Sequence, residues 1–205
     1  MLHTLTTYYD LETREHAQRV VPLAKAIAHS LGLSRKEIFL IGMAALLHDI
    51  GKVGVAPSIL NKCGPLNGEE WEMMRLHSEI GQQMLLLAGG VFATLAPMVV
   101  AHHERWDGYG YPFGLREEEI PIGARIIAVV DSFDAMISSR PYHRCMTVAE
   151  SRAELWRGAG RQYDPRIVVA FSALLDQQIP SVTNGTFAPY LLPTPARLSQ
   201  TTISA

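Results

Sequence analysis

The stretch Ile38-Phe39-Leu40-Ile41-Gly42-Met43-Ala44-Ala45-Leu46-Leu47-His48-Asp49 decides the fold, because almost every residue in it is apolar. Ser34 and Glu37 stand in front of it in a capping-box pattern, which predicts a helix over residues 35–48. A helix without a polar face is buried on most sides, so we expect it at the centre of the domain. The helix ends in a histidine and an aspartate, two residues that need partners when they are buried.

Helical periodicity continues on both sides of this segment, and no segment predicts a strand. Residues 51–66 are rich in glycine and proline, so we expect a loop with a short turn near residues 58–60. The expected fold class is therefore all-α, a bundle of about seven helices. Besides residues 35–48, the expected helices cover residues 10–31, 67–87, 91–104 with a kink at Pro97, 122–139, and two segments that begin at Thr147 and at Asp164-Pro165.

The composition is that of one globular domain, with 205 residues of which 48% are hydrophobic and 19% charged. A formal net charge of −2 gives no basic field that would attract nucleic acid or an anionic membrane. The chain has no apolar run of about 18 residues, and its N-terminus lacks the pattern of a signal peptide, so we expect a cytoplasmic protein. After Pro180 the residues are mainly polar or proline, which predicts a poorly ordered tail over residues 181–205.

A second informative stretch is His102-His103-Glu104-Arg105-Trp106-Asp107-Gly108-Tyr109-Gly110-Tyr111-Pro112. Two adjacent histidines end an apolar run, and each buried imidazole would bring two nitrogens that need partners. Such a pair suits a metal site better than a core, because neutral imidazole is a common ligand for iron, zinc, manganese or nickel. The loop over residues 105–121 is interpreted either as a rim that shapes access to the site or docks a partner, or as an Ω-like loop folded on its own aromatic residues.

More histidines and carboxylates lie on apolar helical backgrounds, and one metal site explains them together. Taken singly, each has an ordinary interpretation: a surface histidine, an ion pair at a helix end, or a hydrogen-bonded buried carboxylate. Five histidines and up to three carboxylates are too many for one ion, and the absence of thiolates argues against structural zinc. We therefore expect two or three divalent ions, with iron as the first choice and manganese as the second. The candidate ligands are Glu12, His16, His48, Asp49, His77, His102, His103 and Asp131.

Metal ions paired at this kind of site activate a bridging water and hold the oxygens of a phosphoryl group in line. Lys52 follows His48 by four residues and would bring an ammonium group close to the same site, where it could neutralise phosphate charge. As an isolated surface lysine it would have no functional meaning.

The motif His48-Asp49-Ile50-Gly51-Lys52, the His102–Pro112 stretch and Arg140-Pro141-Tyr142 together resemble the HD-GYP family, over roughly residues 8–180. The resemblance implies a helical bundle of the HD superfamily and a metal-dependent phosphodiesterase. The family hydrolyses cyclic di-GMP to pGpG, with GMP as a candidate further product, through a metal-bridging hydroxide. Two other functions stay open: a catalytically weak module that senses cyclic di-GMP or docks a cyclase, and a phosphohydrolase for another cyclic dinucleotide.

The resemblance also assigns roles to individual residues. It implies that Asp49 bridges two metals and acts in catalysis together with Lys52, and that Glu12 helps to hold a third ion. The 105–121 loop is then a docking surface for diguanylate cyclase domains. One position departs from the family, because His143 stands where members often carry lysine or arginine, and a neutral imidazole binds phosphate less well. The residues expected to contact the substrate are Lys52, Tyr111, Arg140, His143 and Arg144.

Overall fold

The computed structural model describes residues 11–138 and 145–178 of the chain, with the side chains of residues 15–138 and 145–177. Within these ranges every regular element is a helix, and the one β-type pairing is an isolated bridge between Ala159 and Tyr163. The prediction of an all-α fold is confirmed. The expected tail over residues 181–205 lies outside the described residues, so its order stays a prediction.

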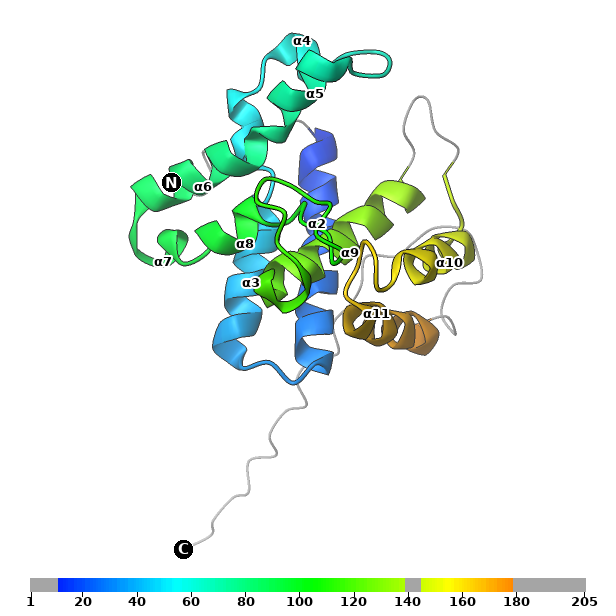
Figure 1. Ribbon diagram of the computed structural model, residues 1–205. Coiled ribbons are helices and arrows are strands. Elements are labelled where there is room, and N and C mark those ends of the chain that lie inside the picture. The colour runs from blue at the N-terminus through cyan, green and yellow to red at the C-terminus, as the bar shows by residue number, and fades with distance from the viewer. Residues whose placement is uncertain (1–10, 139–144, 179–205) are drawn as a thin grey trace, which may run out of the picture.

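Three helices form the centre of the molecule: α2 (Leu11–Ser30), α3 (Arg35–Leu47) and α9 (Ile122–Ile137). Helix α2 packs against both α3 and α9, and α3 also contacts α9 (Figure 1). The largely apolar helix expected over residues 35–48 is therefore central, although its partners leave Phe39 and Leu46 exposed. The fully buried core includes Val20, Ala24, Ile27, Ala44, Ala45, Ile126, Ile127, Val130 and Phe133.

The remaining helices flank this centre on two sides (Figure 1). One group holds η1 (Ile50–Gly54), α4 (Pro57–Leu60), α5 (Gly68–Arg75), α6 (His77–Ala88), α7 (Gly90–Ala93) and α8 (Ala96–Val100). The other group holds α10 (Val148–Gly158) and α11 (Pro165–Gln178), which pack against each other and against α9. A short turn of helix, η2 (Glu117–Glu119), lies in the loop before α9.

The helix starts predicted from capping residues are confirmed. Ser34, Asn67 and Thr147 each accept a hydrogen bond from the backbone N–H three residues later, and the glutamate at that position bonds back to the cap. Pro165 is the first residue of α11, where a missing N–H costs nothing. Local chemistry was sufficient to place these boundaries.

Two expected helices are each divided in the structure. The helix predicted over residues 67–87 breaks at Leu76, which leaves α5 and α6 as separate helices. The helix predicted over residues 91–104 consists of α7 and α8 followed by a turn, so His102 and His103 lie beyond the end of α8. The expected kink at Pro97 is wrong, because this proline is the second residue of α8, in the first turn, where no intrahelical N–H bond is lost.

None of the described helices combines the length and the apolar character that crossing a membrane requires.

Candidate metal centre

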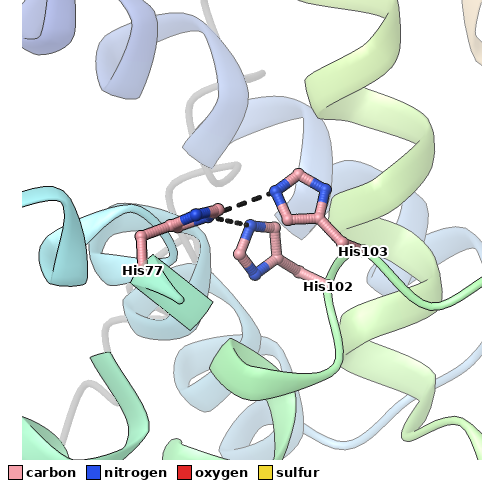
Figure 2. Close-up of side chains that lie close together, drawn as sticks. All are labelled: His77, His102 and His103. Carbon is pink, nitrogen blue, oxygen red and sulfur yellow. Dashed lines mark hydrogen bonds between the residues drawn. The ribbon is translucent and has the colours of Figure 1, made fainter. Parts of the chain in front are cut away.

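Six of the expected ligands form two clusters at the junction of the central helices with the α6 and α8 side. The first cluster contains His16, His48 and Asp49, and the second contains His77, His102 and His103. Within each cluster one potential ligand atom from every residue lies within 4.8 Å of the others. Figure 2 shows the second cluster, in which His77 comes from the start of α6 and the other two imidazoles from the turn after α8.

In the first cluster, residues from three parts of the chain meet. The Nε2 atoms of His16 and His48 are 3.4 Å apart, and Asp49 Oδ2 lies 3.4 Å from His48 Nε2. Asp131, from α9, adds its Oδ1 atom 3.4 Å from His16 Nε2 and 3.9 Å from His48 Nε2. Its side chain is 26% exposed, so Asp131 lies beside the cluster without being deeply buried.

In the second cluster, the two neighbouring histidines both point toward His77 (Figure 2). The Nε2 atom of His77 lies 3.4 Å from Nε2 of His102 and 3.2 Å from Nε2 of His103. His77 is 2% exposed and His102 is 1% exposed. The interpretation of His77 as a surface residue is therefore wrong.

Asp49 connects the two clusters. Its Oδ2 atom faces His48, and its Oδ1 atom lies 3.5 Å from Nε2 of His77. A carboxylate that offers one oxygen to each cluster has the geometry of a bridging ligand between two ions.

The hydrogen bonds of the imidazoles test whether this arrangement suits a metal. Nδ1 of His48, His77 and His102 lies 2.8, 2.7 and 2.5 Å from the backbone carbonyl oxygen of Ala45, Met74 and Val99, respectively. A carbonyl only accepts, so each Nδ1 carries a proton and Nε2 is the ring nitrogen that remains to bind a cation. The Nε2 lone pairs of His77 and His102 face each other at 3.4 Å and have no proton to share. A cation between them would satisfy both, so the donor set fits divalent metal ions.

Helix ends explain why these three rings share one geometry. Each histidine lies three residues after the carbonyl that it contacts, at a point where α3, α5 or α8 has just ended. The last carbonyls of a helix lack an intrahelical N–H partner and are free to accept from a side chain. Two of these helix ends, those of α5 and α8, were not predicted from sequence periodicity, and each of them orients a candidate ligand.

The electrostatics of the two clusters differ. Burial alone would lower the pKa of His48, but the carboxylates of Asp49 and Asp131 outweigh it and raise that pKa to about 9. In the second cluster burial dominates, so that the pKa of His103 falls to about 3 and that of His102 falls well below its usual value. Burial would raise the pKa of Asp49, yet His48 and Lys52 hold it well below the ordinary range. The site therefore combines neutral imidazoles with an anion, and it favours positive charge at Nε2 of His48.

Sequence reasoning missed the pair that supports His16. Asp134, three residues after Asp131 on α9, is 2% exposed, and its Oδ2 atom lies 2.8 Å from His16 Nδ1. Arg19 donates to both of its oxygens, with Nε 2.5 Å from Oδ1 and Nη2 3.0 Å from Oδ2. A carboxylate behind a ligating histidine sets the tautomer and raises the basicity of the ring. The three-residue spacings of Asp131 with Asp134 and of His16 with Arg19 were the available signal.

The expected substrate contacts are only partly described. Lys52 places Nζ 2.6 Å from Asp49 Oδ2 and keeps its side chain 40% exposed, so it lies at the edge of the site as expected. Tyr111 stacks on His103, with ring centroids 4.8 Å apart. Arg140, His143 and Arg144 lie outside the described residues, as does the side chain of Glu12 at the start of α2.

The 105–121 loop is anchored by Glu104, another residue that sequence reasoning missed. This glutamate is 3% exposed and accepts hydrogen bonds from the backbone N–H groups of Phe113, Gly114 and Leu115, at 2.6, 3.1 and 3.1 Å. Tyr109 and Phe113 are 79% and 57% exposed. The interpretation of the loop as folded on its own aromatic residues is therefore wrong for these two side chains.

Comparison with known proteins finds relatives that are named as cyclic dinucleotide phosphodiesterases. A family model described as HD domain matches residues 5–167. A cyclic di-GMP phosphodiesterase of Thermotoga maritima is 45% identical over 175 residues, which are 85% of this chain and 48% of that protein. The 3′3′-cGAMP-specific phosphodiesterase 2 of Vibrio cholerae is 40% identical over 158 residues, which are 77% of this chain and 30% of that protein. The chain thus spans less than half the length of these curated relatives.

A solved structure shares the fold. A HDG"Y"P protein from Bdellovibrio bacteriovorus aligns with a TM-score of 0.63 and 22% identity, over 78% of this chain and 51% of that chain. The likeness extends the agreement from sequence to the arrangement of helices.

Proposed function

We propose, from the premise that this chain belongs to the HD domain family and carries the motifs of its HD-GYP members, that it is a metal-dependent phosphodiesterase for cyclic di-GMP. One observation supports this proposal above all others: two clusters of imidazole lone pairs converge on either side of Asp49. Two ions that shared this carboxylate would suit phosphoryl transfer better than a purely structural role.

The residues proposed to hold metal fall into two groups. Two divalent ions would be held by His16, His48, Asp49, His77, His102, His103 and Asp131. A third ion would be held with the help of Glu12. When bound, such ions lower the pKa of a water molecule for in-line attack on phosphorus and neutralise charge on the phosphoryl oxygens. We propose iron as the native metal and manganese as an alternative, because borderline divalent ions accept mixed imidazole and carboxylate ligands.

The chain's own side chains act on the substrate in a definable way. Asp49 stays ionised because its pKa is held low, so it keeps an acceptor oxygen on each side of the centre. Lys52 presents an exposed ammonium next to that carboxylate, from which it can neutralise a phosphate of the incoming dinucleotide. We propose Arg140 as a second phosphate contact, with His143, Arg144 and the hydroxyl of Tyr111 as further contacts.

The test is hydrolysis of cyclic di-GMP by protein purified without oxygen, with the metal content measured on the same sample. We expect pGpG, or pGpG followed by GMP, with at least two metal ions per chain. His48→Ala should lower turnover at least about 100-fold, because outer-shell partners alone account for 10–100-fold in metal sites.

A matched control is His29→Ala, since His29 lies in the last turn of the same helix that carries His16 and is exposed. Thirteen residues separate the two, or about 20 Å along the helix. This control should retain metal and turnover. Full turnover in His48→Ala, or two bound metals without hydrolysis of any cyclic dinucleotide, would contradict the phosphodiesterase proposal and favour a sensing or docking module.

The Vibrio relative makes 3′3′-cGAMP a second candidate substrate. Turnover of cyclic di-GMP, 3′3′-cGAMP and cyclic di-AMP should be compared on one preparation, and we expect cyclic di-GMP to be hydrolysed fastest. We also propose that exposed Tyr109 and Phe113 dock a diguanylate cyclase domain. Loss of cyclase binding in a Tyr109→Ser, Phe113→Ser variant with unchanged turnover would support that contact, and unchanged binding would contradict it.

A further inference from the structure

Four side chains form a continuous stack that leads outward from the buried second cluster. The rings of His102 and His103 have centroids 3.9 Å apart, and the ring of Tyr111 lies 4.8 Å from that of His103 at an interplanar angle of 25°. The Cζ atom of Arg75 lies 4.4 Å from the centroid of Tyr111. A guanidinium at this distance from an aromatic face is attracted by the ring quadrupole.

The other contacts of Arg75 do not explain its position. Its Nη1 atom lies 3.2 Å from Glu72, whose side chain is 70% exposed, and exposed pairs of this kind contribute little. Its Nε atom is buried without a hydrogen-bond partner, which is unfavourable. The contact with Tyr111 is therefore the interaction that accounts for the placement of the guanidinium.

Chain connectivity links Arg75 to the second cluster as well. Arg75 ends α5, and His77 begins α6 two residues later. The hydroxyl of Ser78, which is fully buried, donates to the carbonyl of Arg75 at 3.1 Å and ties the two helices together at their junction. One junction thus carries both a ligand and the cation that holds Tyr111.

The first cluster also has an arginine behind one of its histidines. Arg19 holds Asp134, and Asp134 holds His16 through Nδ1. In the second cluster, the ring of Tyr111 lies between Arg75 and His103. Glu104 accepts hydrogen bonds from three backbone N–H groups just after Tyr111 and so fixes the loop that carries this ring. Each cluster is therefore backed by its own arginine.

We propose that Arg75 is a positioning residue for the second cluster: by holding Tyr111 against His103, it keeps Nε2 of His103 directed at His77. The inference rests on the proposed function in so far as that cluster binds a divalent ion. Without the guanidinium, Tyr111 can tilt and the His103 ring gains rotational freedom, so the cluster binds its ion less tightly. The first cluster keeps its affinity, because Arg19 and Asp134 are untouched.

The experiment is titration of Mn²⁺ into metal-free protein, by calorimetry for the affinities and by electron paramagnetic resonance for the stoichiometry. Arg75→Met should weaken one of two Mn²⁺ sites about tenfold and leave the other unchanged. Arg75→Lys keeps the charge but loses the planar group, and it should show a smaller loss in the same site. The matched control is Arg157→Met, which removes an exposed arginine paired with the glutamate three residues earlier, as in the Arg75–Glu72 pair, but touches neither cluster.

A double-variant comparison tests whether Arg75 acts through the tyrosine. Tyr111→Leu alone should weaken the same site by a similar factor, and adding Arg75→Met should change it no further. Wild-type affinity at both sites in Arg75→Met, or two losses that multiply in the double variant, would overturn the inference while leaving the proposed function standing. Failure of the wild-type protein to bind two Mn²⁺ ions would instead overturn the proposed function, and this inference with it.

Discussion

Replacement of Gly51 by alanine should separate the two halves of the metal centre. Gly51 lies in η1, which packs closely on α6. A Cβ atom at this position would collide first with the carbonyl oxygen of His77. It would also lie 2.5 Å from the amide nitrogen of Gly81 and 2.8 Å from the carbonyl carbon of His77, where real Cβ contacts are essentially never under 3.0 Å. All three obstacles are backbone atoms, so no side chain can rotate away.

The size of the effect follows from this geometry. To reach ordinary van der Waals separation, η1 and α6 must move apart by roughly 1.5 Å. Overpacking of a core costs about 1–3 kcal/mol, and we expect about 3 kcal/mol here because the obstruction is main chain. For a protein of this size the midpoint of thermal unfolding should fall by roughly 6–12 °C. The same movement would lengthen the 3.5 Å approach of Asp49 to His77, so Asp49 could no longer serve both clusters.

The assay is thermal unfolding of metal-free protein in EDTA, followed by Mn²⁺ titration of the folded fraction. Gly68→Ala is the control, because Gly68 is the first residue of α5 and an added Cβ there meets nothing within 4 Å. It should be neutral or stabilising by up to about 1 kcal/mol. If Gly51→Ala unfolded in EDTA within about 2 °C of the wild-type protein and bound two Mn²⁺ ions with wild-type affinity, the reasoning would be refuted.

Three further outcomes are expected. Asp134→Asn removes the negative charge that Arg19 contacts through Nε and Nη2, so urea unfolding in EDTA should show a loss of about 2–3 kcal/mol. One Mn²⁺ site should also weaken 10–100-fold, and unchanged affinity would contradict a support role. Mn²⁺ at a hundred times its dissociation constant should stabilise the protein against unfolding by about 2.7 kcal/mol per site. Ca²⁺ at the same concentration should not, because it prefers oxygen ligands, and equal stabilisation by both ions would contradict an imidazole site. Glu104→Gln removes one acceptor oxygen and should speed hydrogen exchange at the amide of Leu115; exchange at the wild-type rate would show that this bond does not hold the loop.

Much of the fold could be predicted because its determinants are local. A capping box such as Ser34 with Glu37 acts within one turn, and apolar periodicity over residues 35–48 needs no knowledge of distant partners. Where a helix continues or breaks is less local. Leu76 and the residues around Pro97 carry no strong stop signal, and the breaks are stabilised by hydrogen bonds from side chains, such as that of His77 to the Met74 carbonyl.

The candidate ligands were recognisable from the sequence because their chemistry is unusual there. Adjacent histidines at 102 and 103 and an aspartate within the apolar run of α9 are hard to explain as ordinary core residues. Conversely, Asp134 and Arg75 look like common surface residues until their surroundings are known. The roles proposed for Arg140, His143 and Arg144 stay predictions, since these residues lie outside the described part of the chain.

The sequence by itself determined the helical class, the caps and the kinds of ligand, since these depend on side-chain type and on spacing within a few residues. Only the tertiary structure decided how the ligands are grouped. His16 meets Asp134 across 118 positions, and His77 meets His102 across 25. Such contacts depend on how α2, α6, α8 and α9 pack, and packing is set by the whole core at once. The division into two clusters around Asp49, each backed by an arginine, is therefore a property of the folded chain.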